Sequence, residues 1–183
     1  MDLAEALRNY REKIVAQWVD YTLSTYGAAE FFSKQRDKFA NPVGGNIREG
    51  LDKIFLQLAK SADGKAADAE QFREPLQQIL LIRSVQEFTP SQAVAPLNAV
   101  KHITRELLAG DKERSIFIKD LYDFEFAVDL LMLNAFDMYM EARERLYKTR
   151  IAEIKSGNFI LAESRCPSKS FLAEPLIPTV KNL

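Results

Sequence analysis

The sequence holds a single cysteine and a single histidine among its 183 residues, and this scarcity excludes several kinds of chemistry. Cys166 has no second cysteine with which to form an intrachain disulfide. Tetrahedral zinc sites of the usual types need several cysteine or histidine ligands, so they are excluded as well. The Glu-x-x-His motif of di-iron bundles is absent because Ala99 stands three residues before His102. The G-x-S-x-G motif of serine hydrolases is also missing.

Long apolar runs and an excess of one charge are missing too. No stretch of about eighteen uncharged apolar residues is present, so we expect no membrane span. The N-terminus, "MDLAEALRNYREK", lacks the apolar core of a signal peptide. Lysine and arginine number 25 against 26 acidic residues, so nothing attracts the whole chain to nucleic acid or to an acidic membrane. We therefore expect a cytoplasmic protein with no nucleic-acid or membrane partner.

Helical periodicity is dense, whereas strand signals are poor. Apolar residues recur at steps of three and four, as in the series from Leu3 to Tyr21. The length suits one domain with a real core. The pattern predicts an all-α single domain, with helices over residues 2–26, 42–60, 72–85, 90–109 and 115–155.

Two helix starts are marked by a capping residue followed by proline. Asn41 can cap a helix whose first residue is Pro42, where the missing N–H costs nothing. Thr89 and Gln92 fit a capping box around Pro90. Both helices therefore have well-specified beginnings.

Proline and glycine also mark irregular points inside the predicted helices. Pro96 lies about two turns into the helix over 90–109, which predicts a kink there. Gly44, Gly45 and Gly50 weaken helix propensity, and we expect them to allow close packing against another helix. A phosphate-binding loop is excluded at these glycines, because no strand precedes them and no Gly-Lys-Ser/Thr follows.

The stretch "IRSVQEFTPSQAV" at residues 82–94 joins two predicted helices. Arg83 and Gln86 fall on the last turn of the first helix, where a cation suits the negative end of the helix dipole. The alternative interpretation makes Arg83 a partly buried organiser or ligand contact. On that interpretation it pairs with an acidic residue of the long helix, such as Asp137 or Glu141.

The last predicted helix is unusually long, and we expect a break near residues 120–123. Between Phe126 and Met140 apolar residues occur on nearly every side. We infer that one face packs in the monomer core and another meets a second subunit; the alternative is a central helix enclosed within a monomer. Residues 141–155 carry mixed charge, which fits either a salt-bridged surface or a partner-binding surface.

No residue combines the properties of a catalytic or ligating group. His102 lies roughly opposite the apolar stripe of its helix, so it should face solvent, which argues against a haem ligand or a catalytic base. Cys166 has no activating neighbour and is expected to be unreactive. We predict no enzyme activity, no metal site and no cofactor.

Three of these stretches resemble one family. The segments "RDKFANPVGGNIREGL", "IRSVQEFTPSQAV" and "AFDMYMEARERLYKTRIAEIK" look like the N-terminal domain of RsbRD-type stressosome co-antagonists. The same domain resembles the input heads of some bacterial histidine kinases. The resemblance covers about residues 5–157. The family-like positions are Phe39, Asn41, Pro42, Gly44, Arg83, Val85, Gln86, Phe88, Pro90, Ser91, Ala93, Tyr139, Arg143, Glu144 and Tyr147.

The resemblance implies an all-α, globin-like arrangement of helices without haem, and a sensory or protein-interaction role. The family has no catalytic residues that could be assigned to positions of this sequence. We expect a helical domain over residues 1–157 and an extended or disordered tail over 158–183. One departure is the segment Ala95-Pro96-Leu97, where a bulkier apolar run is expected. The other is the missing output module, from which we expect a stand-alone input domain.

The function expected from these features is non-enzymatic regulation through protein–protein interaction, as a homodimer with an unidentified protein partner. The alternatives are a receptor for a small apolar ligand in a globin-like pocket, or an accessory subunit of an enzyme complex. The residues predicted to serve as interaction or structural motif positions are Asn41, Arg83, Gln86, Phe88, Tyr139, Arg143, Glu144 and Tyr147.

Overall fold

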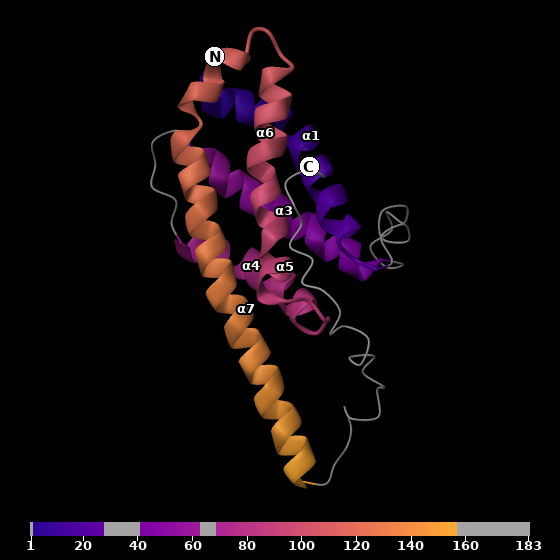
Figure 1. The fold of residues 1–183 in the computed structure, drawn as a ribbon. Coiled ribbons are helices and arrows are strands. Elements are labelled where there is room, and N and C mark those ends of the chain that lie inside the picture. The colour runs from indigo at the N-terminus through magenta and orange to yellow at the C-terminus, as the bar shows by residue number, and fades with distance from the viewer. Residues whose placement is uncertain (1, 28–40, 63–68, 157–183) are drawn as a thin grey trace.

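The computed structural model describes residues 2–27, 41–62 and 69–156, and these residues are helical with no strand among them (Figure 1). The prediction of an all-α fold with a long C-terminal helix is confirmed. The described α-helices are α1 (Leu3–Ser24), α3 (Pro42–Ser61), α4 (Ala69–Ser84), α5 (Pro90–Val94), α6 (Ala99–Ala109) and α7 (Tyr122–Ser156). Two 3-10 helices, η1 (Ala95–Asn98) and η2 (Ser115–Asp120), precede α6 and α7.

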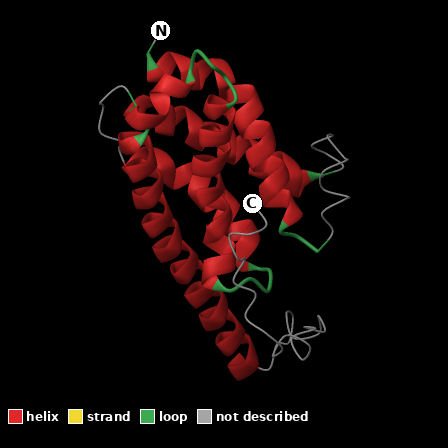
Figure 2. Cartoon of the chain, turned by 45° about the horizontal axis from the view of Figure 1, so that its top comes forward, coloured by secondary structure: helices red, strands yellow, loops and turns green. Residues whose placement is uncertain are grey.

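The helices pack around one core. α3 lies between α1 and α4, α6 packs on α1, and α4 and α5 pack on α7. Figures 1 and 2 both show α7 running along one side of the molecule, with its C-terminal part projecting beyond the other helices. The buried residues of α7 accordingly extend only from Phe124 to Ala142. The projecting part therefore packs little against the rest of the described chain.

α1 begins and packs as its sequence predicts. Asp2 caps it, since its Oδ1 accepts a hydrogen bond of 2.7 Å from the N–H of Glu5. Ile14 and Trp18 are fully buried. The indole Nε1 of Trp18 donates to the carbonyl oxygen of Pro96 at 2.8 Å, which ties the middle of α1 to η1. This bond satisfies the one polar group of a buried tryptophan.

The start of α3 and its approach to α4 follow from single residues. Asn41 Oδ1 accepts from the N–H of Gly44 at 2.8 Å, so the predicted cap is confirmed. A Cβ atom at Gly50 would lie 2.9 Å from Cδ1 of Ile79 and 3.2 Å from the carbonyl oxygen of Pro75. Glycine at this position therefore lets α3 and α4 approach closely, as predicted.

The predicted helix over 90–109 is three elements. The capping box is confirmed, because Thr89 Oγ1 accepts from the N–H of Gln92 and Gln92 Oε1 accepts from the N–H of Thr89. The chain then tightens into η1 at Pro96, the kink that the proline predicted, and continues as α6. Gly110 ends α6 at its C-cap position.

The predicted break before the long helix is also confirmed, since η2 ends at Asp120 and α7 begins at Tyr122. One face of α7 is buried in the core: Phe124, Ala127, Val128, Leu131, Ala135, Tyr139 and Ala142. The other face is open, with Leu133 66% exposed and Phe136 44% exposed. The alternative interpretation, a central helix enclosed within the monomer, is therefore wrong.

Three further expectations concern the globin-like arrangement, the C-terminal tail and membrane-spanning helices. The globin-like arrangement stays a prediction. The predicted tail over residues 158–183, with Cys166, lies outside the described residues, so the proposed domain boundary also stays a prediction. In the part of the chain that the structure describes, no helix is both long and apolar enough to cross a membrane.

Candidate functional site at the joint of α4 and α5

The segment from Arg83 to Gln92, here called the joint, connects α4 to α5 and packs against the end of α1 and the middle of α7. Residues far apart in sequence meet here. Most of the side chains predicted from sequence lie at this place: Arg83, Gln86, Phe88, Tyr139, Arg143 and Tyr147.

Arg83 is only 1% exposed, and it is bound by oxygen atoms of neutral groups. Its Nη2 donates to Thr25 Oγ1 at 3.1 Å and to the carbonyl oxygen of Gln92 at 3.0 Å. The predicted ion pair with Asp137 or Glu141 is wrong, because neither carboxylate bonds to this guanidinium. Glu141 lies instead 4.0 Å from Arg145, one turn along α7.

Two aromatic rings take the place of the missing carboxylate. The guanidinium carbon of Arg83 lies 4.9 Å from the ring centre of Tyr26 and 4.1 Å from that of Phe88. These rings meet edge to face, with centroids 5.4 Å apart. Burial lowers the pKa of Arg83, and the nearby Tyr26 opposes this shift. Nε and Nη1 of Arg83 have no hydrogen-bond partner among the described residues.

α7 holds the joint from the opposite side through two polar side chains. The hydroxyl of Tyr139 donates to the carbonyl oxygen of Phe88 at 2.6 Å. Arg143 Nη1 donates to the carbonyl oxygens of Ser84 at 3.0 Å and Gln86 at 3.3 Å. Carbonyls at the end of a helix lack partners within it, so Arg143 caps the C-terminus of α4 from another helix.

The Tyr139 hydroxyl stays a hydrogen-bond donor at neutral pH. Burial raises the pKa of Tyr139, while the positive charge of Arg143 opposes that rise. Arg143 is itself steadied by Tyr147, whose hydroxyl accepts from Nη2 at 2.6 Å and whose ring centre lies 4.9 Å from the guanidinium carbon. This group positions α7 against the joint and contains no acid–base pair.

An open groove of about 480 Å³ lies between the joint and α7. Its walls are mainly apolar and aromatic, and they include Phe88, Tyr139 and Met140. Gln86 also lines it, and the buried Oε1 of this residue has no partner among the described residues. The groove has the size and the lining of a small-ligand site.

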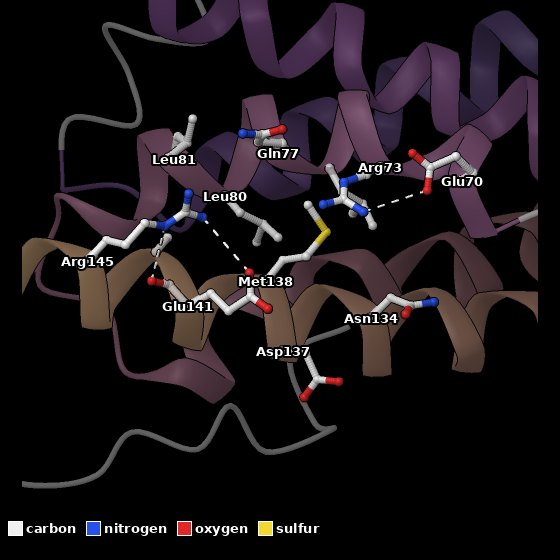
Figure 3. A pocket seen from close by; sticks show the side chains of 12 residues that line it. Glu70, Arg73, Gln77, Leu80, Leu81, Asn134, Asp137, Met138, Glu141 and Arg145 are labelled. Atoms are coloured by element: carbon white, nitrogen blue, oxygen red, sulfur yellow. Dashed lines mark hydrogen bonds and ion pairs between the residues drawn. The ribbon is translucent and has the colours of Figure 1, made fainter.

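A second groove, of about 410 Å³, follows the contact between α4 and α7 (Figure 3). Met138 points from α7 toward α4 in its middle, while Asp137 points away from α4. Ion pairs lie at its two ends, Arg73 with Glu70 at 3.7 Å and Arg145 with Glu141. These four charges are paired and exposed, and among the charged residues that line the groove only Asp137 has no ion pair in the described part of the chain.

Two predicted residues lie outside the joint. Asn41 caps α3, and Glu144 pairs with Lys148 at 2.7 Å on the exposed side of α7. That partner lowers the pKa of Glu144 through a side-chain hydrogen bond. His102 is exposed, as predicted. Within the described ranges, no group of three or more histidine, cysteine, aspartate or glutamate side chains could hold a metal ion.

Sequence reasoning missed Thr25 and Tyr26 at the end of α1. Their roles depend on contact with Arg83, which is 58 positions away from Thr25. No local pattern marks either residue as part of the joint. Tyr26 follows the last turn of α1, where the periodic apolar pattern has already ended.

The fold and the joint together define an α-helical domain, held together by a polar and aromatic cluster, with one long helix exposed on its outer face. A family model described as the RsbT co-antagonist protein rsbRD N-terminal domain matches residues 12–154, well over half of the chain. The chain belongs to this family, which consists of stressosome-type signalling and regulatory domains. Comparison of this chain with the curated proteins and with the solved structures found no match.

Proposed function

We propose that this chain is a non-enzymatic input domain that regulates by binding proteins and that works as a homodimer. The observation that supports this is a row of large apolar side chains on the outer face of α7, each between 44% and 66% exposed. This row, here called the α7 stripe, consists of Phe126, Leu130, Leu133, Met140, Tyr147, Ile151 and Ile154.

The α7 stripe has the geometry of an interface. At 100° per residue it lies roughly half a turn around the helix from the buried face that contains Leu131 and Ala135. Single exposed apolar residues are normal, but seven large apolar residues at regular spacing along one face of a helix mark an interaction surface, here interrupted at Asp137 and Glu144. Burying one leucine side chain at such a contact contributes about 1.5–3 kcal/mol.

The joint provides a physical link between this interface and the rest of the domain. Tyr139 and Arg143 lie on α7 beside the stripe residue Met140, and both bond to carbonyl groups of the joint. A shift of α7 at the interface would strain these bonds. We infer that binding at the stripe and the conformation of the joint are coupled in this way.

Sedimentation velocity on the full chain tests the homodimer. We expect the wild-type protein to sediment as a dimer at about 10 µM, and Leu130→Lys to raise the dimer Kd at least tenfold, about 1.4 kcal/mol. Leu81→Lys is the matched control, because Leu81 is 46% exposed but lies on α4 away from the stripe. A monomeric wild type, or equal loss of dimer in both variants, would contradict the proposal.

A second candidate function is reception of a small apolar ligand, and the groove beside the joint favours it. This groove is open to the surface between the joint and α7, which differs from the globin-like pocket expected from the resemblance. Native mass spectrometry of the purified full chain tests it. A co-purifying small molecule that is lost in Met140→Glu, where a carboxylate replaces an apolar wall, would support this function.

A further inference from the structure

We propose that the α7 stripe pairs with the same stripe of a second copy of this chain and that the two helices run antiparallel. This inference rests on the proposed homodimer and specifies its geometry. Three features of α7 carry it: the spacing of the stripe, the distribution of charge along the helix, and the projecting C-terminal part.

The stripe follows the alternating steps of four and three residues that characterise a coiled-coil seam. Continued through the whole helix, this spacing places Asp137 and Glu144 in the seam between the apolar members. A parallel, in-register pair would set each of these carboxylates against its own copy, and like charges that close repel. An antiparallel pair with its two-fold axis near residue 138 separates the two copies of Glu144 by about 16 Å along the axis, so that repulsion is removed, whereas the two copies of Asp137 remain near the axis.

Charge is divided between the two halves of α7. Residues 122–141 contain no lysine or arginine, and their carboxylates are Asp123, Glu125, Asp129, Asp137 and Glu141. Residues 142–156 contain only two carboxylates, Glu144 and Glu153, against the basic residues Arg143, Arg145, Lys148, Arg150 and Lys155. A parallel pair aligns like halves, whereas an antiparallel pair aligns the acidic half of each helix with the basic half of the other.

Not all of these charges are available for a second copy. Glu125 pairs with Arg105, and Asp129 pairs with Lys101 at 2.5 Å in the same chain. The Asp129 side chain nevertheless remains 55% exposed. Arg150 forms no ion pair among the described residues. Asp129 and Arg150 flank opposite ends of the stripe, so they can meet between two antiparallel copies.

These contacts select one register, with the two-fold axis between Asp137 and Met140. Phe126 of one copy then lies opposite Ile151 of the other, and Leu130 lies opposite Tyr147. In the same register the flanking Asp129 lies beside Arg150 of the second copy. At the middle of the seam Leu133 lies opposite Glu144 and Met140 lies opposite Asp137. The pairing therefore joins apolar layers and opposite charges toward the two ends of the contact.

The antiparallel arrangement also explains how the projecting part of α7 is covered. This part lies beyond the last buried residue, Ala142, and isolated helical segments of this length are marginal in water (Figures 1 and 2). In the proposed dimer it packs along the first half of α7 of the second copy, whose opposite face is held by the core of its own chain. Each copy thereby supports the helix end of the other.

Pulsed electron–electron double resonance on the full chain tests whether the two α7 helices run antiparallel. Single nitroxide labels are placed at Glu141→Cys and at Ala152→Cys, each with Cys166→Ser. Both positions are exposed and lie on the same side of α7 away from the stripe. With a rise of 1.5 Å per residue, the proposed register separates the two copies of position 141 by about 8 Å along the axis and those of position 152 by about 40 Å.

The expected result is a short distance for the first label and a distance of about 4 nm or more for the second. Short and similar distances for both labels indicate a parallel dimer, which overturns this inference and leaves the proposed homodimer intact. Absence of any intermolecular distance for both labels, with monomeric sedimentation, overturns both. Each label is checked by sedimentation velocity, so a variant that no longer dimerises is recognised.

Discussion

Arg83 shows how one side chain organises the domain. A buried cation is costly unless other groups replace its hydration, and here two aromatic faces and two oxygen acceptors do so without a carboxylate. The guanidinium touches the end of α1, the loop before α5 and α5 itself. It therefore holds the end of α4 and the start of α5 against the end of α1.

Two substitutions at Arg83 distinguish how much its packing and its charge each contribute to the free energy of unfolding. We expect Arg83→Ala to lower the free energy of unfolding by about 2–5 kcal/mol, because it leaves a cavity between two rings. Arg83→Met fills most of that space and removes the cost of burying a charge, so we expect a loss of about 1.5 kcal/mol or less. Urea unfolding monitored by circular dichroism measures both values. Equal losses in the two variants would mean that the charge and its hydrogen bonds stabilise the fold more than the packing does.

At the scale of helices, most boundaries follow from residues within one turn. The caps at Asn41 and Thr89, the kink at Pro96 and the break before Tyr122 were all predictable, because each depends on a backbone group and a side chain close in sequence. The contact between α3 and α4 differs, since glycine at position 50 predicts close approach without naming the neighbour.

Replacement of that glycine tests the contact. Gly50→Ala gains about 1 kcal/mol of helix propensity, but the new Cβ would press on Ile79 and on the backbone of Pro75 at a cost of about 1–3 kcal/mol. We expect a net loss of stability in urea unfolding. Gly110→Ala is the control, because its Cβ would meet nothing closer than 3.5 Å, so we expect a change within about 0.5 kcal/mol. A stabilised Gly50→Ala would show that α3 and α4 can move apart freely.

At the scale of the whole molecule, α7 belongs to two environments. Its inner face completes the core and holds the joint through Tyr139 and Arg143, while its outer face presents the α7 stripe. Stability and self-association should therefore be linked, because a dimer that forms only from folded chains stabilises them by mass action.

The linkage predicts a melting temperature that depends on protein concentration. Raising the concentration of the wild-type chain a hundredfold, from 2 to 200 µM, should raise the melting temperature by roughly 3–5 °C. Leu130→Lys should show a smaller rise over the same range, because it weakens the dimer while its exposed side chain contributes little to the monomer fold. Scanning calorimetry measures both. A wild-type melting temperature that does not change with concentration would argue against the dimer.

The sequence by itself determined the helices, their caps and breaks, and the family, because these depend on short-range periodicity and on motifs that are read along the chain. It also identified most residues of the joint by resemblance. Only the tertiary structure decided how they meet. Thr25, Tyr26 and Phe88 surround Arg83 where a carboxylate was expected, because packing brings α1 beside the end of α4. Packing likewise decided which face of α7 stays exposed, since the core can cover only one side of a helix at the edge of the domain.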